Sequence, residues 1–180
     1  PTPQLLIEDW LLENTIAMLV GDTGSFKSTL AIDIGVCIQN SLPWHSLRTR
    51  ACNVAIFNHE DGSGFKTRDL ANVDHYEINE PALFWDSEVP NLLNTAEVDA
   101  RISAMKDAGI GLVVIDTLAH AIPGADENSA KDMGVAISNL IRIKQQLNAT
   151  VLVVHHTGKD ASKGARGSSP LKAAVGTETP

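Results

Sequence analysis

The sequence feature that most constrains the fold is a glycine- and hydroxyl-rich segment that follows a short apolar run. Residues 16–20 read Ile-Ala-Met-Leu-Val, and residues 21–29 read Gly-Asp-Thr-Gly-Ser-Phe-Lys-Ser-Thr. A glycine, a lysine six residues later and then a hydroxyl residue, placed between a strand and a helix, is the spacing of a phosphate-binding loop. We therefore predict a nucleotide-phosphate site made of Gly21, Asp22, Thr23, Gly24, Ser25, Phe26, Lys27, Ser28 and Thr29.

The chemistry of such a loop assigns a role to two of its side chains. Consecutive backbone N–H groups surround the anion, and the helix that follows points its positive end at it. Lys27 would reach the β- and γ-phosphates, and Ser28 would supply its hydroxyl to Mg²⁺. Phe26 departs from the usual pattern, because a glycine there lets the backbone pass close to phosphate. The alternative is an ordinary strand-to-helix turn with a surface lysine.

Length and charge bound the rest of the interpretation. The chain has 180 residues, enough for one α/β domain with a sizeable core. A net charge of −8 argues against a surface coated with basic residues for nucleic acid, although it allows a local basic groove. Without a signal peptide or an apolar run long enough to span a bilayer, we expect a cytoplasmic protein with no membrane partner. Because the chain begins at Pro1, we also expect a fragment of a longer protein.

Short apolar runs alternate with helical patterns, which is typical of β-α-β units. We expect strands at 16–20, 53–57, 82–85, 112–115 and 150–154, and helices at about 27–39 and 65–73. Two further helices should begin at Thr95 and Ser129 as N-caps. The second of these should face the core with Met133, Ile137, Leu140, Ile141 and Leu147. The pattern predicts a mostly parallel sheet with helices on both faces, in a single domain over residues 1–180.

The strand predicted at 112–115 is followed by Asp116 and Thr117. A nucleotide-binding sheet needs a carboxylate at such a strand end to hold Mg²⁺ through water. Ligands of open parallel sheets bind at the carboxyl ends of the strands, so Lys27 and Asp116 should converge there. The alternative is an aspartate that only caps the next turn.

Two other strand ends carry candidate catalytic groups. Glu60 lies just beyond the strand at 53–57 and is our candidate for the base that takes a proton from the attacking water, with Asp61 as the nearer rival. A solvated acidic loop is the alternative. His155 and His156 follow the strand at 150–154, and only one of them can face the γ-phosphate, because adjacent strand residues point to opposite faces. We expect a γ-phosphate sensor there, with a simple polar strand end as the alternative.

The segment after these histidines is rich in glycine, serine and lysine. Between residues 159 and 172, Lys159, Lys163, Arg166 and Lys172 are opposed by Asp160 alone. A basic loop beside a nucleotide site can contact phosphate, either on the nucleotide or on nucleic acid. The alternative is a solvated surface loop without a function.

Five segments together resemble a known family. They are Gly-Ser-Phe-Lys-Ser at 24–28, Val-Val-Ile-Asp-Thr-Leu-Ala at 113–119, Asp-Glu-Asn-Ser-Ala-Lys-Asp-Met at 126–133, His-His-Thr-Gly-Lys-Asp at 155–160 and Ala-Arg-Gly-Ser-Ser at 165–169. With these segments the chain resembles, from about residue 3 to 179, the RepA-type ATPases of plasmids and phages. These are RecA-like motor proteins related to hexameric replicative helicases.

The resemblance implies more than the residues do by themselves. It implies a RecA-like P-loop fold that stops before the last strands of related proteins, with ATP and Mg²⁺ as cofactors. It also implies that Phe26 is an ordinary variant, that Glu60 is the catalytic glutamate and that His156, rather than His155, is the sensor. Arg166 falls where the family carries an arginine finger that reaches a neighbouring subunit, whereas His120 stands where an arginine is common.

For function, the resemblance implies a DNA helicase in plasmid or phage replication that acts on single-stranded DNA as a homo-oligomeric ring, with a hexamer as the expected assembly. Two other classes stay open. One is a recombination or repair ATPase of the same fold that binds DNA without unwinding it. The other is an assembly protein that binds ATP without hydrolysing it.

Overall fold

The computed structural model describes residues 4–59, 62–78, 83–125, 129–156 and 177–179, with 62–63 and 177–179 described as backbone only. Its main sheet has the strand order β5-β4-β6-β7-β3-β8, and every neighbouring pair is parallel. The strands are β3 (Ile16–Gly21), β4 (Asn53–Asn58), β5 (Phe84–Asp86), β6 (Ile110–Asp116), β7 (Thr150–His156) and β8 (Thr177–Thr179). A separate antiparallel hairpin, β1 (Leu5–Ile7) and β2 (Leu11–Leu12), precedes them.

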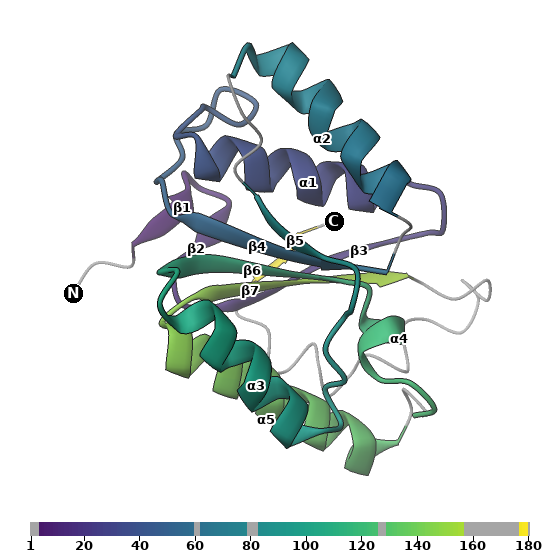
Figure 1. The fold of residues 1–180 in the computed structure, drawn as a ribbon. Coiled ribbons are helices and arrows are strands. Elements are labelled where there is room, and N and C mark those ends of the chain that lie inside the picture. Colours follow the sequence, from purple (N-terminus) through teal and green to yellow (C-terminus); the bar gives the residue numbers. More distant parts are fainter. Residues whose placement is uncertain (1–3, 60–61, 79–82, 126–128, 157–176, 180) are drawn as a thin grey trace.

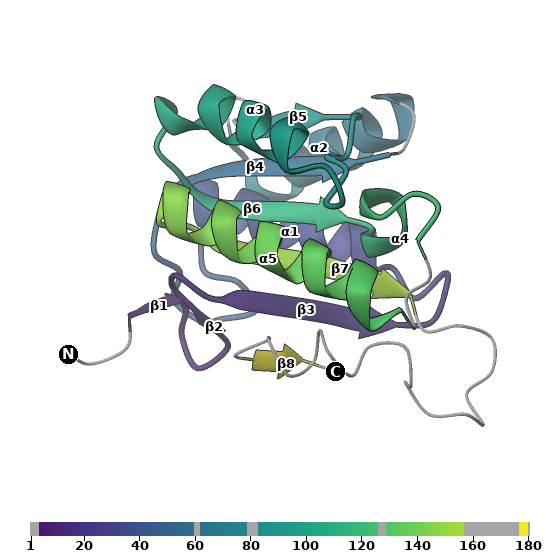
Figure 2. The ribbon, with the colours of Figure 1, turned by 90° about the horizontal axis from the view of Figure 1, so that it is seen from below.

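Helices cover both faces of the sheet, as Figure 1 shows. The helices α1 (Lys27–Gln39) and α2 (Gly62–Tyr76) lie on one face. The other face carries α3 (Thr95–Lys106), the short α4 (Leu118–Ala121) and α5 (Ala130–Leu147). Seen from below in Figure 2, α5 runs along the sheet beside β7, and the β1–β2 hairpin lies at the end of β3 where that strand begins. This three-layer α/β arrangement is the RecA-like P-loop fold that the sequence predicted.

Each strand contributes to two cores, one under each helical layer. Ile16 and Met18 of β3 pack into the core beneath α3 and α5, whereas Ala17 and Leu19 pack into the core beneath α1. Parallel strands buried on both faces need apolar residues at every position, which is why they appear as continuous apolar runs in the sequence. The sheet is therefore a rigid platform for whatever its strand ends carry.

Most predicted elements are confirmed, with shifts of a few residues at their ends. Two local predictions were wrong. The N-cap of α3 is Asn94 rather than Thr95, because the Asn94 side chain accepts a hydrogen bond from the Glu97 N–H at 3.4 Å. On α5, Ile141 is exposed and Ile143 is buried, because the face turned to the sheet runs through Met133, Ala136, Leu140 and Ile143. Ser129 does cap α5, accepting from the Asp132 N–H at 3.3 Å.

The register brings four strand ends to one edge of the sheet. Gly21 at the end of β3 is paired with His156 of β7, and Asn58 at the end of β4 is paired with Asp116 of β6. Since all these strands are parallel, the loops that follow them open at the same edge, where ligands of such sheets bind. Within the described ranges, no helix combines the length and the apolar character needed to cross a membrane.

Candidate functional site

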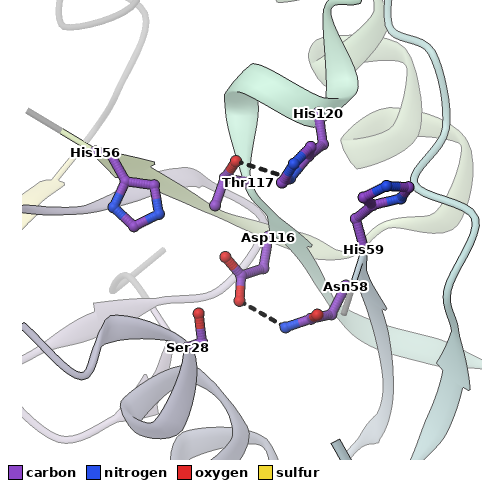
Figure 3. A pocket seen from close by; sticks show the side chains of 7 residues that line it. All are labelled: Ser28, Asn58, His59, Asp116, Thr117, His120 and His156. Carbon is purple, nitrogen blue, oxygen red and sulfur yellow. Dashed lines mark hydrogen bonds between the residues drawn. The ribbon is translucent and has the colours of Figure 1, made fainter. Parts of the chain in front are cut away.

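A pocket of about 120 Å³ opens at this edge of the sheet. Its walls come from the start of α1, the ends of β4, β6 and β7, and the turn into α4 (Figure 3). The lining residues are Ser28, Asn58, His59, Asp116, Thr117, His120 and His156. Three predicted site residues, Ser28 at the start of α1, Asp116 at the end of β6 and His156 at the end of β7, thus meet at one place.

The predicted phosphate loop connects β3 to α1, and its lysine turns inward. Only 5% of Lys27 is exposed. Its Nζ donates to the Asp22 carbonyl oxygen at 2.5 Å and to the Ser25 Oγ at 3.0 Å. Burial lowers the pKa of Lys27, while the negative charges of Asp116 and Asp22 act in the opposite direction. A buried ammonium held by loop oxygens is ready to exchange them for the oxygens of a phosphate.

Phe26 occupies the loop position where a glycine is usual, and the structure shows how a larger residue is accommodated there. Its backbone adopts the left-handed conformation (φ 60°, ψ 19°), which glycine adopts at no cost, and its side chain is 80% exposed. The ring therefore points away from the loop rather than into it. No side chain caps the start of α1, all of whose residues are described, so the first N–H groups of the helix stay open to an anion.

Asp116 ends β6 and is only 4% exposed. Its Oδ2 accepts a hydrogen bond from the Asn58 Nδ2 at 2.8 Å, while its Oδ1 is buried and has no hydrogen-bond partner in the described part of the chain. Burial raises the pKa of Asp116, and the hydroxyl of Ser28 and the positive charge of Arg68 act in the opposite direction. The peptide bond that follows, Asp116–Thr117, is cis.

These residues fit a magnesium nucleotide. Ser28 faces the Asp116 carboxylate in the pocket (Figure 3), so a hydroxyl and an open carboxylate oxygen lie together. The charge of Asp116 also acts on the buried ammonium of Lys27. Hydroxyl, carboxylate and phosphate oxygens are the ligands that Mg²⁺ prefers. The described residues contain no cluster of three or more His, Cys, Asp or Glu suited to a metal ion. A cation here would thus depend on bound phosphate for part of its coordination.

The two histidines at the end of β7 separate as adjacent strand residues must. His156 lines the pocket, whereas His155 is 8% exposed and is not part of its wall; its Nδ1 lies 2.8 Å from the His156 carbonyl oxygen. The Nδ1 of His156 is buried and has no hydrogen-bond partner among the described residues. Burial, with the nearby charge of Lys27 as the next cause, lowers the pKa of His156. A neutral imidazole there has one nitrogen available to a ligand.

Four lining residues received no role from the sequence. Asn58 is described above. The rings of His59 and His120 stack with centroids 4.7 Å apart, and the His120 Nδ1 lies 3.3 Å from the Thr117 Oγ1. For Asn58, His59 and Thr117 the only signal was a position at the end of β4 or directly after β4 or β6. For His120 it was the resemblance, in which an arginine is common at that position. Arg68 of α2, whose charge acts on Asp116, gave no signal at all.

Several predicted residues lie outside the described part of the chain. They are Glu60, its rival Asp61, Arg166, and the other basic residues of the segment at 159–172. Their roles remain predictions from the sequence and its resemblance.

Comparison with known proteins adds one finding. A family model described as an AAA domain matches residues 1–162, which include the phosphate loop and the ends of β4, β6 and β7. A comparison with curated proteins found no matching sequence.

Proposed function

Because the chain belongs to the AAA-domain family of P-loop ATPases, we propose that it binds ATP with Mg²⁺ and hydrolyses ATP at the carboxyl edge of its sheet. The observation that supports this best is the buried, unpartnered Oδ1 of Asp116, which lies in the same pocket as the Ser28 hydroxyl. A buried carboxylate oxygen without a partner costs stability unless something binds to it. A cation is the partner that explains it.

The side chains divide the work between phosphate and cation. Lys27 and the open N–H groups at the start of α1 bind the phosphates, and Ser28 with Asp116 orients the Mg²⁺. The cation supplies charge neutralisation on the phosphate oxygens. His156 lines the pocket wall opposite Asn58 and donates or accepts a hydrogen bond at the γ-phosphate.

Two residues outside the described ranges complete the proposal. Glu60 orients the attacking water and accepts its proton. Arg166 reaches the nucleotide of a neighbouring subunit and stabilises charge in the transition state. Both assignments are supported by the resemblance to RepA-type ATPases.

The test of the enzyme is steady-state ATP turnover with Mg²⁺ and with excess EDTA. We expect turnover only with Mg²⁺, and a loss of about 100-fold or more in Lys27→Met. Lys106→Met is the matched control, because Lys106 ends α3 just before β6 begins, at the opposite edge of the sheet. Equal loss in both variants would contradict the assigned site.

Glu60→Gln separates an enzyme from a nucleotide-binding assembly protein. We expect the variant to bind ATP as the parent does and to turn it over far more slowly, because the amide cannot take a proton. If the parent itself fails to hydrolyse ATP as an oligomer with DNA present, the chain binds ATP without being an ATPase.

We further propose that the domain is part of a ring-shaped, hexameric DNA helicase acting in plasmid or phage replication. This finer function is supported by the five segments that resemble RepA-type ATPases. Its test combines the mass of the assembly, the stimulation of turnover by single-stranded DNA and a duplex-unwinding assay. Strand exchange without unwinding would instead indicate a recombination ATPase.

A further inference from the structure

Asn58 is a polar side chain in a position where the fold otherwise places apolar ones. The four residues before it in β4, Val54 to Phe57, are buried and apolar, and Asn58 itself is only 1% exposed. Burying an amide is costly unless it forms hydrogen bonds. The Nδ2 group of Asn58 forms one with Asp116, at 2.8 Å from Oδ2.

The sheet itself fixes this contact. Asn58 and Asp116 are register partners in the parallel pair β4–β6, so their side chains leave the same face side by side. A hydrogen bond to a carboxylate is stronger and more directional than one between neutral groups. The Asp116 carboxylate is therefore held by a neighbour whose backbone position the strand pairing fixes.

The consequence concerns the other carboxylate oxygen. In Figure 3, Asn58 lies on one side of the Asp116 carboxylate, and Ser28 and His156 lie on the other. With Oδ2 engaged by Asn58, rotation of the carboxylate is restricted and Oδ1 is the oxygen left for a ligand. Groups that orient a metal ligand in this way contribute to the affinity for the metal.

We propose that Asn58 is a positioning residue of the cation site: its side-chain amide orients Asp116 so that Oδ1 stays available to Mg²⁺ and its bound water. This rests on the proposed function, because it assigns the open oxygen to the cation of a magnesium nucleotide. Asn58 touches neither nucleotide nor cation in this role, and acts through Asp116 alone.

A purely structural role for Asn58 would be to tie β4 to β6. A second buried asparagine offers a matched control for that role. Asn139 of α5 is 3% exposed and donates to the Leu92 carbonyl oxygen at 2.8 Å and to the Thr95 Oγ1 at 3.2 Å. It belongs to no part of the pocket. Replacing either residue by leucine removes a buried amide of similar size.

The experiment measures binding of a fluorescent, slowly hydrolysed ATP analogue to the full chain, first in EDTA and then over a series of Mg²⁺ concentrations. For Asn58→Leu we expect a half-saturating Mg²⁺ concentration about tenfold higher than in the parent, with the affinity in EDTA unchanged within about twofold. For Asn139→Leu we expect both quantities to match the parent, even if its thermal stability falls as much as that of Asn58→Leu.

The outcomes separate this inference from the proposed function. If the parent gains no affinity from Mg²⁺, the magnesium nucleotide site fails and the role of Asn58 fails with it. If the parent depends on Mg²⁺ and Asn58→Leu shows the same half-saturation, only the role of Asn58 is overturned. Should Asn58→Leu not fold, Asn58→Ala and Asn139→Ala give the same comparison, because alanine also removes the donor.

Discussion

Asp116 at the end of β6 is buried and Asp33 within α1 is partly buried, yet the two carboxylates differ in how many hydrogen-bond partners they have. In Asp33 both oxygens are used: Oδ2 accepts from the Trp44 Nε1 at 2.9 Å, and Oδ1 accepts from the Tyr76 hydroxyl at 2.7 Å. In Asp116 only Oδ2 has a partner, and Oδ1 has none in the described part of the chain. Both oxygens of the Asp33 carboxylate therefore have hydrogen-bond partners within the fold, whereas one oxygen of the Asp116 carboxylate has none among the described residues.

The difference indicates which carboxylate serves the structure and which serves a ligand. Asp33 links α1 to the segment that carries Trp44 and to the end of α2. Both of its hydrogen bonds therefore contribute to the free energy of unfolding. Asp116 is more buried but less satisfied, which is an arrangement that folding alone does not favour. The proposed cation site would account for its burial.

The largest expected effect comes from replacing the Asp116 carboxylate by a neutral amide. We expect Asp116→Asn to lower ATP turnover by about 100- to 1,000-fold, because a neutral amide no longer holds the cation. Its thermal stability should equal or exceed that of the parent, because a neutral group replaces a buried carboxylate. Turnover and a thermal melt of the same preparation measure both quantities. A clear fall in melting temperature would place Asp116 with Asp33 as a structural residue.

The corresponding variant at the other carboxylate is Asp33→Asn. Here one of the two donors would face an amide NH₂ group instead of an oxygen, which lowers the free energy of unfolding by about 2 kcal/mol. For a chain of this length that cost lowers the melting temperature by about 4–8 °C. Turnover per folded molecule at saturating ATP should stay within twofold of the parent. A tenfold loss of turnover, with folding intact, would show that Asp33 also serves the site.

The site residues that a local sequence pattern marks could be predicted from the sequence. Lys27 and Asp116 follow continuous apolar runs, and such runs are reliable signs of buried parallel strands whose ends share one edge. Position along the chain therefore sufficed to bring the two together. The same logic placed Ser28 at the start of α1.

What could not be predicted depends on contacts between distant segments. Asn58 resembled an ordinary polar strand end, because its partner lies 58 residues away on a strand whose adjacency the sequence does not state. The strand order β5-β4-β6-β7-β3-β8 is not the chain order. Choosing Ile141 instead of Ile143 for the core has a similar cause, since the face that α5 turns to the sheet is set by tertiary packing.

The pH dependence of thermal stability gives a further test of the difference between a carboxylate that stabilises the fold and one that destabilises it. Burial raises the pKa of Asp116 above its ordinary value of 3.8, so the ionised carboxylate destabilises the fold at neutral pH, and this cost disappears as the pH falls below 3.8. We expect the melting temperature of Asp116→Asn to exceed that of the parent most near pH 7, with the gap closing on acidification. Melts followed by circular dichroism from pH 7 downward measure it.

Asp99 is the control for that sign. The hydrogen bond from Arg142 lowers the pKa of Asp99, so this partly exposed carboxylate stabilises the fold above pH 3.8 and loses that contribution as the pH falls through its lowered pKa. Asp99→Asn should therefore melt slightly below the parent near pH 7, opposite to Asp116→Asn. The same sign for both variants would contradict the assigned cause of the Asp116 shift.

The smallest expected effect concerns the loop that presents Ser28 to Asp116. Phe26 holds a left-handed backbone that costs a non-glycine residue about 1 kcal/mol, while glycine loses about 0.5–1 kcal/mol more backbone entropy on folding. The two nearly cancel, so Phe26→Gly should leave the melting temperature within about 3 °C of the parent. Because the ring is 80% exposed, affinity for the ATP analogue should change less than threefold. Phe26→Ala keeps the backbone cost without the ring. If both variants weaken nucleotide binding tenfold, the ring contacts the ligand, and the loop contributes more to the site than its backbone.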